Sequence, residues 1–265
     1  MSKISFIGSG NMGSAIISGV ISSGLCSPAD ITAADVSRTA LDSLSDTLKI
    51  ATTTDNAEAA KKADILFLSV KPNMFSKVIP GIKDSVSENT LIISIAAGMS
   101  VSDIEKLFAK EIKLIRVMPN LNATVGEAMS ALCPNKNVDA DSLDMAKRIF
   151  ESIGECEVVD EHLMDAVVAV SGSSPAYAFM FIEALADAAV CEGMPRVQAY
   201  KFAAQSLLGS AKLVLESGRH PADLKDAVCS PAGTTIEAVA VLEKEGFRNA
   251  IIDAARACAK KNREM

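Results

Sequence analysis

The chain changes character near residue 160, and this change constrains its fold more than any single residue does. Before that point, short apolar runs alternate with stretches whose apolar residues recur at helical spacing. The runs are apolar almost throughout, which is typical of strands covered on both faces of a sheet. Strands that alternate with helices predict a parallel α/β sheet with right-handed crossovers. The predicted strands are Ile4–Gly8, Ile31–Asp35, Ile65–Val70, Leu91–Ala96 and Ile112–Met118, and the helices between them include Asn11–Ser23 and Asp103–Lys110.

After about Glu161 the strand pattern stops and only helical patterns follow. Their faces are rich in Ala, Leu and Val and are more apolar than one small bundle needs. We therefore expect a buried interface between two copies of the chain; a core within one chain is the alternative, and composition does not separate the two. The predicted domains are residues 1–160 and 161–265. The predicted helices are Ala176–Glu192, Arg196–Ser217, Thr234–Lys244 and Phe247–Lys261, with breaks at Gly193–Pro195 and Ser217–Gly218.

Composition excludes several classes of protein. The 265 residues are 49% apolar, enough for one large or two modest domains with a substantial core. A net charge of −7 argues against nucleic-acid binding, which needs clustered Lys and Arg, and two histidines argue against a histidine-based zinc site, so no metal is expected. The apolar stretch Leu163–Val190 is broken by "SGSSP" and carries Glu183 and Asp187, so we expect no membrane span.

The cysteines and the N-terminus predict a cytoplasmic protein. The six cysteines are scattered and show no C-x-x-C spacing, so we interpret them as small core residues of a reduced protein. The N-terminal stretch lacks the long apolar run of a secretory signal. The cysteines are Cys26, Cys133, Cys156, Cys191, Cys229 and Cys258.

The segment "FIGSGNMG" places three glycines directly after a predicted strand and at the opening of a helix. In this context Gly8 permits the tight turn, Gly10 lets the backbone approach a pyrophosphate, and Gly13 lets helix and strand pack closely. We therefore predict a dinucleotide-binding turn that also includes Asn11 and Met12.

The end of the second predicted strand bears on the choice between NADH and NADPH. Asp35 stands where an acidic residue would bind the ribose 2′-hydroxyl of NAD. Ser37 and Arg38 follow at once and would suit a 2′-phosphate, although Arg38 would equally suit a solvated helix start. The sequence leaves the cofactor preference open.

Three further strand ends carry candidate cofactor-binding residues, because open α/β sheets bind ligands at the carboxyl ends of their strands. The segments "SVKP" and "SIAAG" each follow an apolar run, and "RVMPN" ends another. Lys71 would be either catalytic or only a surface lysine, and we expect its backbone, rather than its amine, to matter. Asn120 would either orient a carboxamide or only form a turn. The candidate residues are Val70, Lys71, Pro72, Ala96, Ala97 and Asn120.

The segment "AVCSPAGTTIEAVAVLE" opens a helix with hydroxyls, a glycine and no charge before its first glutamate. A helix start leaves about four N–H groups unpaired. Ser230 or Thr234 would cap some of them, or the N–H groups would await a carboxylate or phosphate. Ser173 or Ser174 would likewise cap the long helix that follows "SGSSP", with Pro175 in its first turn.

Together these motifs resemble Δ1-pyrroline-5-carboxylate reductases, over essentially the whole chain and in the same order. The glycine loop is shared by many dehydrogenases, whereas "SGSSPAY" and "HPADLKDAVCSPAGTTIEAV" are much more specific. The resemblance implies a doubly wound parallel Rossmann-type sheet followed by an all-α dimerisation domain, with dimers that assemble further, commonly as five dimers in a decamer.

The resemblance also implies a reaction and a substrate site. NADPH or NADH would deliver a hydride to the cyclic imine 1-pyrroline-5-carboxylate, giving L-proline in the last step of proline biosynthesis. The substrate carboxylate would lie at the helix start, and the Thr235 hydroxyl, the expected catalytic group, near the ring nitrogen. Neither His162 nor His220 is expected to act as an acid. The implied substrate-binding residues are Ser230, Gly233, Thr234 and Thr235.

Five residues depart from the family pattern, and they keep other hypotheses open. A related cyclic imine is one alternative substrate, and a protein that binds NAD(P) without turnover is another reading. A 3-hydroxyacid dehydrogenase is disfavoured because that family uses a lysine on the long helix, and residues 176–192 contain none. A positive φ at Ala232 would cost roughly 1 kcal/mol. The departures are Leu121, Asn122, Ala128, Ser174 and Ala232.

Overall fold

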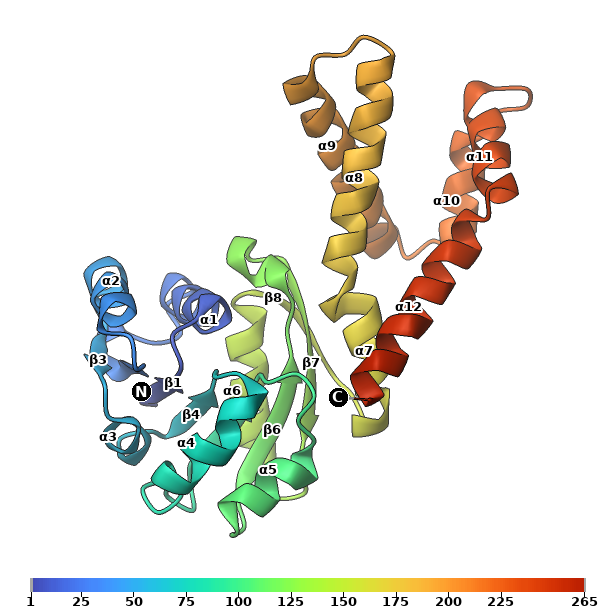
Figure 1. Ribbon diagram of the computed structural model, residues 1–265. Coiled ribbons are helices and arrows are strands. Elements are labelled where there is room, and N and C mark those ends of the chain that lie inside the picture. Colours follow the sequence, from blue (N-terminus) through green and yellow to red (C-terminus); the bar gives the residue numbers. More distant parts are fainter. Residues whose placement is uncertain (1, 265) are drawn as a thin grey trace. The chain divides into compact units, whose positions relative to one another are not determined.

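The computed structural model describes residues 2–264 and divides into two compact units (Figure 1). The first unit, here called the cofactor unit, comprises Met1–Gly172 with Ala259–Met265. The second, the helical unit, comprises Ser173–Cys258. Each is described by itself.

Within residues 2–264, eight strands form one sheet in the order β3-β2-β1-β4-β5-β6-β7-β8. Strands β1 to β6 pair in parallel, in the order of a doubly wound dinucleotide-binding sheet. The antiparallel partner of β6 is β7, and β8 lies parallel to β7. The strands are β1 (Ile4–Ile7), β2 (Ile31–Ala34), β3 (Ala51–Thr53), β4 (Ile65–Leu68), β5 (Leu91–Ser94), β6 (Lys113–Met118), β7 (Ala128–Pro134) and β8 (Gly154–Val158).

All five predicted strands are confirmed to within two residues, and the structure adds β3, β7 and β8. The five predicted strands are parallel, as expected, whereas β7, which the sequence did not predict, pairs antiparallel with β6. Only the short turn η3 (Leu121–Val125) connects them, and a parallel connection needs a crossover of a dozen residues or more. The chain therefore returns antiparallel.

Helices cover both faces of the sheet (Figure 1). On one face, α1 and α6 pack over a core in which the Phe6 and Phe67 rings stack with centroids 4.4 Å apart. On the other face, α4, α5 and α7 cover a second buried cluster. The helices are α1 (Asn11–Ser22), α2 (Arg38–Leu48), α3 (Asn56–Lys61), α4 (Phe75–Ile82), α5 (Val101–Phe108), α6 (Ala140–Glu151) and α7 (Met164–Val167), with short turns η1 (Pro28–Asp30), η2 (Pro72–Met74) and η4 (Glu161–Leu163).

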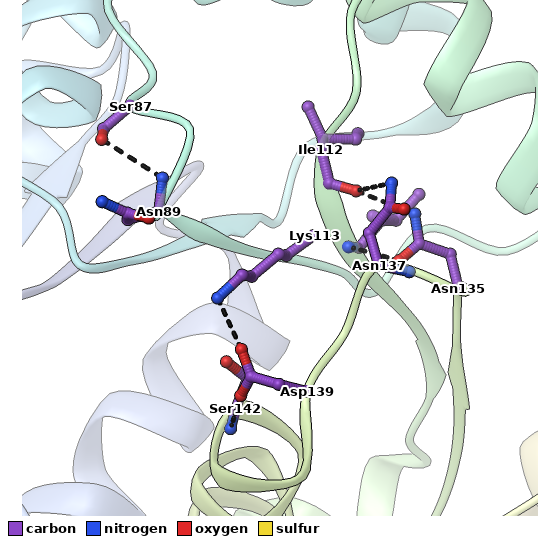
Figure 2. A network of polar contacts seen from close by, with 9 residues as sticks. Ser87, Asn89, Ile112, Lys113, Asn135, Asn137, Asp139 and Ser142 are labelled. Carbon is purple, nitrogen blue, oxygen red and sulfur yellow. Dashed lines mark hydrogen bonds and ion pairs between the residues drawn. The ribbon is translucent and has the colours of Figure 1, made fainter.

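Polar contacts fasten the start of β6 to its neighbours (Figure 2). The side-chain amides of Asn135 and Asn137 donate to the Ile112 carbonyl over 2.9 and 3.0 Å. Lys113 Nζ lies 2.5 Å from Asp139 Oδ2, and this bond holds the pKa of that carboxyl well below its usual range. The beginning of the strand is thus held by side chains from the segment that follows β7.

The helical unit consists of helices and their connections, as predicted. All four predicted helices are confirmed to within two residues, and the breaks occur at Gly193 and Gly218, with φ of 90° and 61°. Many large apolar side chains are exposed on the helices, among them Phe202 at 65% and Leu215 at 81%. The helices are α8 (Ser174–Cys191), α9 (Arg196–Ser217), α10 (Pro221–Val228), α11 (Thr234–Lys244) and α12 (Phe247–Arg263), the last of which ends in the cofactor unit.

The helical run Glu161–Cys191 is long and apolar enough to cross a membrane by length and composition, with a mean hydropathy of 1.3. One such helix is weak evidence for a membrane span, because core helices of soluble proteins pass the same test of length and composition. The expected break at "SGSSP" was only partly right. The chain widens into a π-helix over Val168–Gly172 and bends at Ser173, and the helix then resumes.

The prediction that the cysteines are core residues holds for only two of them. Cys26 and Cys133 are buried, and burial raises the pKa of both thiols. Cys191 is exposed, and the other three are half-buried. All six are free thiols.

Candidate active site

The glycine loop after β1 is shaped by close contacts with β4. Gly8 has φ +99°, and a Cβ there would lie 2.7 Å from the Ser69 carbonyl oxygen. A Cβ on Gly13 would lie 3.0 Å from the Gly8 carbonyl oxygen. Around Gly10, by contrast, a Cβ would meet nothing within 4 Å. The loop is therefore packed at Gly8 and Gly13 and open at Gly10.

Helix α1 starts at Gly10 without a side-chain cap. The first N–H groups of the helix are therefore left for another acceptor, and the exposed Asn11 and half-buried Met12 stand in this turn. An open space beside uncapped N–H groups at the positive end of a helix fits a pyrophosphate.

The Asp35 carboxylate, directly after β2, is engaged by its own chain. Its Oδ2 accepts from Ser9 N at 2.8 Å and from Ser9 Oγ at 2.9 Å, and its Oδ1 accepts from Ser37 N at 2.9 Å. Burial alone would raise the pKa of this carboxyl, but the hydrogen bonds from Ser37 and Ser9 outweigh it and lower the pKa. Asp35 thus ties the glycine loop to the start of α2.

Ser37 and Arg38 lie beside Asp35 at that helix start. Ser37 is the N-cap of α2, and its Oγ accepts from Ala40 N at 3.3 Å. Arg38 is exposed, and no hydrogen bond or ion pair of its guanidinium occurs within residues 2–264. One positively charged group is thus free at the carboxyl edge of β2.

The candidates after β4 and β5 lie at the same edge of the sheet. Val70 contacts the glycine loop: its Cγ1 would lie 3.0 Å from a Cβ on Gly8. Lys71 is exposed and precedes the turn η2, which Pro72 begins. Ala96 is buried and Ala97 half-buried after β5. The carboxyl ends of β1, β2, β4, β5 and β6 therefore carry every candidate cofactor residue.

Asn120, just beyond β6, is buried and does more than form a turn. Its carbonyl accepts from Ala123 N at 3.1 Å, and its Nδ2 donates to the Ser171 carbonyl at 3.1 Å. Its Oδ1 is buried with no hydrogen-bond partner in the described part of the chain. An acceptor is thus left for a donor such as a carboxamide. The departures Leu121 and Asn122 follow it in η3, and Ala128 is buried at the start of β7.

In the helical unit, α11 starts at Gly233 with no side-chain cap. Neither Ser230 nor Thr234 caps the helix, so that alternative was wrong. The Ser230 carbonyl accepts from Gly233 N at 3.0 Å, and a Cβ on Gly233 would overlap Ser230 Oγ. Ser230 and Thr234 are exposed, and Thr235 is half-buried. Uncapped N–H groups and hydroxyls therefore gather at this helix start.

Backbone strain accompanies this arrangement. Ala232 has φ +55°, the left-handed conformation that an alanine adopts at a cost of roughly 1 kcal/mol. The strained residue lies directly before the Gly233 N-cap, so it shapes the turn that brings Ser230 to the helix start.

The expectation that Ser173 or Ser174 caps the long helix was also wrong. Ser173 is the N-cap of α8 but makes no capping bond; its Oγ lies 3.2 Å from Cys258 Sγ instead. His220 is the N-cap of α10, where its Nδ1 accepts from Ala222 N, and His162 is exposed. Among residues 2–264, no group of three or more His, Cys, Asp and Glu side chains is placed to hold a metal.

Sequence reasoning missed two elements of the site. Ser9 donates two hydrogen bonds to Asp35, and its position between two glycines gives no sequence signal for this role. Arg116 is buried and pairs with Glu161 over 2.9 Å. The available signal was a charged residue inside the otherwise apolar run "IKLIRVM".

The sheet order, the glycine loop and the uncapped start of α1 define a dinucleotide-binding oxidoreductase fold. Residues 3–98 match the family described as NADP oxidoreductase, coenzyme F420-dependent, and residues 161–265 match pyrroline-5-carboxylate reductase dimerisation.

Full-length relatives narrow the class further. The pyrroline-5-carboxylate reductase of Escherichia coli (strain K12) is 48% identical over 263 residues, 99% of this chain and 98% of that protein. The structure of a pyrroline-5-carboxylate reductase from Coxiella burnetii matches with a TM-score of 0.93 at 35% identity, covering 99% and 98% of the two chains. That of a Plasmodium falciparum pyrroline carboxylate reductase with NADP bound gives 0.90 at 32%, covering 99% and 97%.

The chain belongs to the pyrroline-5-carboxylate reductase family. It is an NAD(P)H-dependent oxidoreductase that reduces 1-pyrroline-5-carboxylate to L-proline, the last step of proline biosynthesis. Its C-terminal helices form a homodimer, which confirms the expected interface between copies.

Proposed function

We propose that the start of α11 binds the carboxylate of 1-pyrroline-5-carboxylate. Ser230, Gly233, Thr234 and Thr235 form this site, and the Thr235 hydroxyl is the catalytic group near the ring nitrogen. The observation that carries the proposal is the helix start at Gly233, which lacks a side-chain cap although hydroxyls lie beside it. A carboxylate satisfies such N–H groups and is stabilised by the helix dipole.

The chemistry asks little of the protein beyond positioning. Protonation of the imine makes its carbon electrophilic, and bound NAD(P)H supplies the hydride. Residues 229–236 around this helix start contain no lysine, whose charge would disfavour a neighbouring iminium. Thr235 orients the ring nitrogen, and the N–H groups hold the carboxylate, so that the ring is fixed for transfer.

The cofactor would lie along the carboxyl ends of the strands. The residues proposed for it are Gly8, Gly10, Asn11, Met12, Gly13, Asp35, Ser37, Arg38, Val70, Lys71, Pro72, Ala96, Ala97 and Asn120. We assign residues 1–160 to the cofactor and residues 161–265 to dimerisation and substrate binding. The second assignment is supported by the dimerisation family, whose match begins at residue 161.

Exchange of Thr235 tests the substrate site. Thr235→Ala should lower turnover about 100-fold, since one oriented hydroxyl is lost from the reacting centre. Thr235→Ser retains the hydroxyl and serves as the control. Turnover is followed as loss of absorbance at ~340 nm, the nicotinamide band of the reduced cofactor, and NADPH affinity is measured separately. An undiminished rate in Thr235→Ala would remove Thr235 from the mechanism.

NADPH is the proposed preferred cofactor. The Asp35 carboxylate is already occupied by Ser9 and Ser37, and the exposed guanidinium of Arg38 is free for a 2′-phosphate. Arg38→Ala should raise the KM for NADPH about tenfold and leave the KM for NADH nearly unchanged. A wild-type preference for NADH, or equal effects on both cofactors, would reject this assignment.

The assembly of the dimers and the location of the protein in the cell complete the proposal. We propose assembly of five dimers into a decamer, as the resemblance to pyrroline-5-carboxylate reductases implies. Light scattering distinguishes ten chains of 27.7 kDa from two. We also propose a cytoplasmic location, which six free thiols support; fractionation of cells tests it.

A further inference from the structure

One carboxylate oxygen of Glu161 joins three segments that are far apart in the sequence. Arg116 Nη1 donates to Glu161 Oε1 at 2.9 Å. The backbone N–H of Val101 donates to the same oxygen at 2.7 Å. These contacts connect β6, the first residue of α5 and the first residue of η4 within the cofactor unit.

Two of these segments continue directly into proposed cofactor loops. Val101 follows the loop 95–100 that contains Ala96 and Ala97, and Arg116 precedes the end of β6 that leads to Asn120. In the sheet, Arg116 is the register partner of Ser94, which ends β5. The Glu161 oxygen therefore fixes the far end of one loop and the strand that carries the next.

Among the ion pairs within residues 2–264, Arg116–Glu161 has the least exposed basic side chain, while its carboxylate is partly exposed. The Arg116 side chain is only 11% exposed and that of Glu161 39%, whereas the Glu243–Arg248 pair is 48% and 65% exposed. Exposed pairs contribute little, but removal of one partner of a buried pair leaves an uncompensated charge. The geometry at Arg116 is thus strongly constrained.

The other end of the segment 161–171 is fastened to a residue just beyond β6. Asn120 Nδ2 donates to the carbonyl of Ser171 in the π-helix. Residues 161–171 are therefore held to β6 at both ends, once by Arg116 before the strand ends and once by Asn120 after it.

We propose that Glu161 is a positioning residue for the nicotinamide side of the cofactor site. It does not touch the cofactor; it holds the loops 95–100 and 119–120 in place through Val101 and Arg116. This inference rests on the proposed assignment of those loops to the cofactor. Glu161 is also the first residue matched by the dimerisation family.

Three variants test the proposal in the full-length protein. Glu161→Gln removes the charge and should weaken NADPH binding about tenfold, with a smaller change in the KM for the imine. Val101→Pro removes the N–H donor at a first helical position where proline is tolerated, next to Ser100 at φ −77° and ψ 160°. Glu243→Gln breaks an exposed arginine pair and is the control.

The measurements are the NADPH dissociation constant by nucleotide fluorescence, the KM values for NADPH and for the imine, kcat and the melting temperature. Weaker NADPH binding in Glu161→Gln and Val101→Pro, with none in Glu243→Gln, supports the proposal. A lower melting temperature with an unchanged dissociation constant would mean a purely structural role and overturn it.

Asn120→Ala, measured in parallel, separates this inference from the loop assignment. If Asn120→Ala weakens NADPH binding and Glu161→Gln does not, the loop assignment stands and the positioning role is refuted. If neither variant changes the dissociation constant, both are refuted. An effect of Glu161→Gln alone supports positioning of loop 95–100 and removes Asn120 from the cofactor site.

Discussion

Two helices of this protein begin in the same way in different surroundings. Helices α1 and α11 each have a glycine N-cap, Gly10 and Gly233, in extended conformation, and neither has a side-chain cap. Each therefore leaves its first N–H groups without a side-chain partner.

The difference is in the support behind each turn. The turn before α1 is held by other elements: Gly8 packs against Ser69, and Ser9 is bonded to Asp35. The turn before α11 is held locally, by the bond from Gly233 N to the Ser230 carbonyl, and it includes the strained Ala232. The start of α1 is thus built into a packed domain, whereas the start of α11 depends on its own loop.

The largest expected effect comes from a methyl group on the packed turn. Gly8→Ala places a Cβ 2.7 Å from the Ser69 carbonyl oxygen at φ +99°, and should destabilise the cofactor unit by roughly 3 kcal/mol. Thermal unfolding and NADPH titration measure the loss.

Gly10→Ala is the matched variant, because its Cβ meets nothing within 4 Å. We expect little change in its melting temperature but NADPH binding at least about tenfold weaker, since the methyl group occupies the approach to the pyrophosphate. Equal melting temperatures for Gly8→Ala and the wild-type protein would contradict the packed-turn interpretation.

A smaller effect is expected from the hydrogen bonds that hold the packed turn. Because the pKa of Asp35 is lowered in the folded protein, its stabilising contribution is fully present above 3.8, the ordinary value, and is lost as the pH falls through the folded-state pKa. Asp35→Asn should lower stability near neutral pH by about 1 kcal/mol or less, once solvent screening is allowed for.

The measurement is urea unfolding of the wild-type protein and Asp35→Asn, once at neutral pH and once at a pH well below the ordinary pKa of an aspartate. The difference between wild-type and Asp35→Asn should shrink on acidification. A difference that is independent of pH would show that the charge of Asp35 does not stabilise the loop.

The buried strands of the sheet were predictable from the sequence, and two of the exposed ones were not. Strands β1, β2, β4, β5 and β6 are buried runs, and their apolar sequences reveal them. Strand β3 has three residues at the sheet edge, and β8, "GECEV", carries exposed charges, so neither shows an apolar run. These strands form because the sheet offers them hydrogen bonds, which is tertiary information.

The site was predictable where a local pattern defines it and not where distant contacts do. The glycine spacing and the hydroxyls before α11 are local patterns. Whether Ser230 or Thr234 caps the helix depends on the turn geometry, and the sequence offered both outcomes. The Arg116–Glu161 contact joins residues 45 positions apart, so only the folded sheet brings the two together.

The smallest predicted effect concerns strain in the locally supported turn. Ala232 and Ala109 have similar φ values, 55° and 53°, but Ala109 ends α5 in the cofactor unit. Exchange for glycine relieves about 1 kcal/mol of strain and returns part of it through the greater freedom of the unfolded chain. Each variant should therefore gain about 0.5 kcal/mol, a rise of roughly 1–2 °C in melting temperature.

Function should separate the two variants. Ala232→Gly loosens the turn that presents the Gly233 N-cap, so the KM for 1-pyrroline-5-carboxylate should rise about twofold, because the free loop samples more conformations. Ala109→Gly should leave that KM unchanged. Equal KM values in both variants would show that the α11 turn needs no rigidity of its own to bind a carboxylate, and the two helix starts would then differ in packing but not in how they hold an anion.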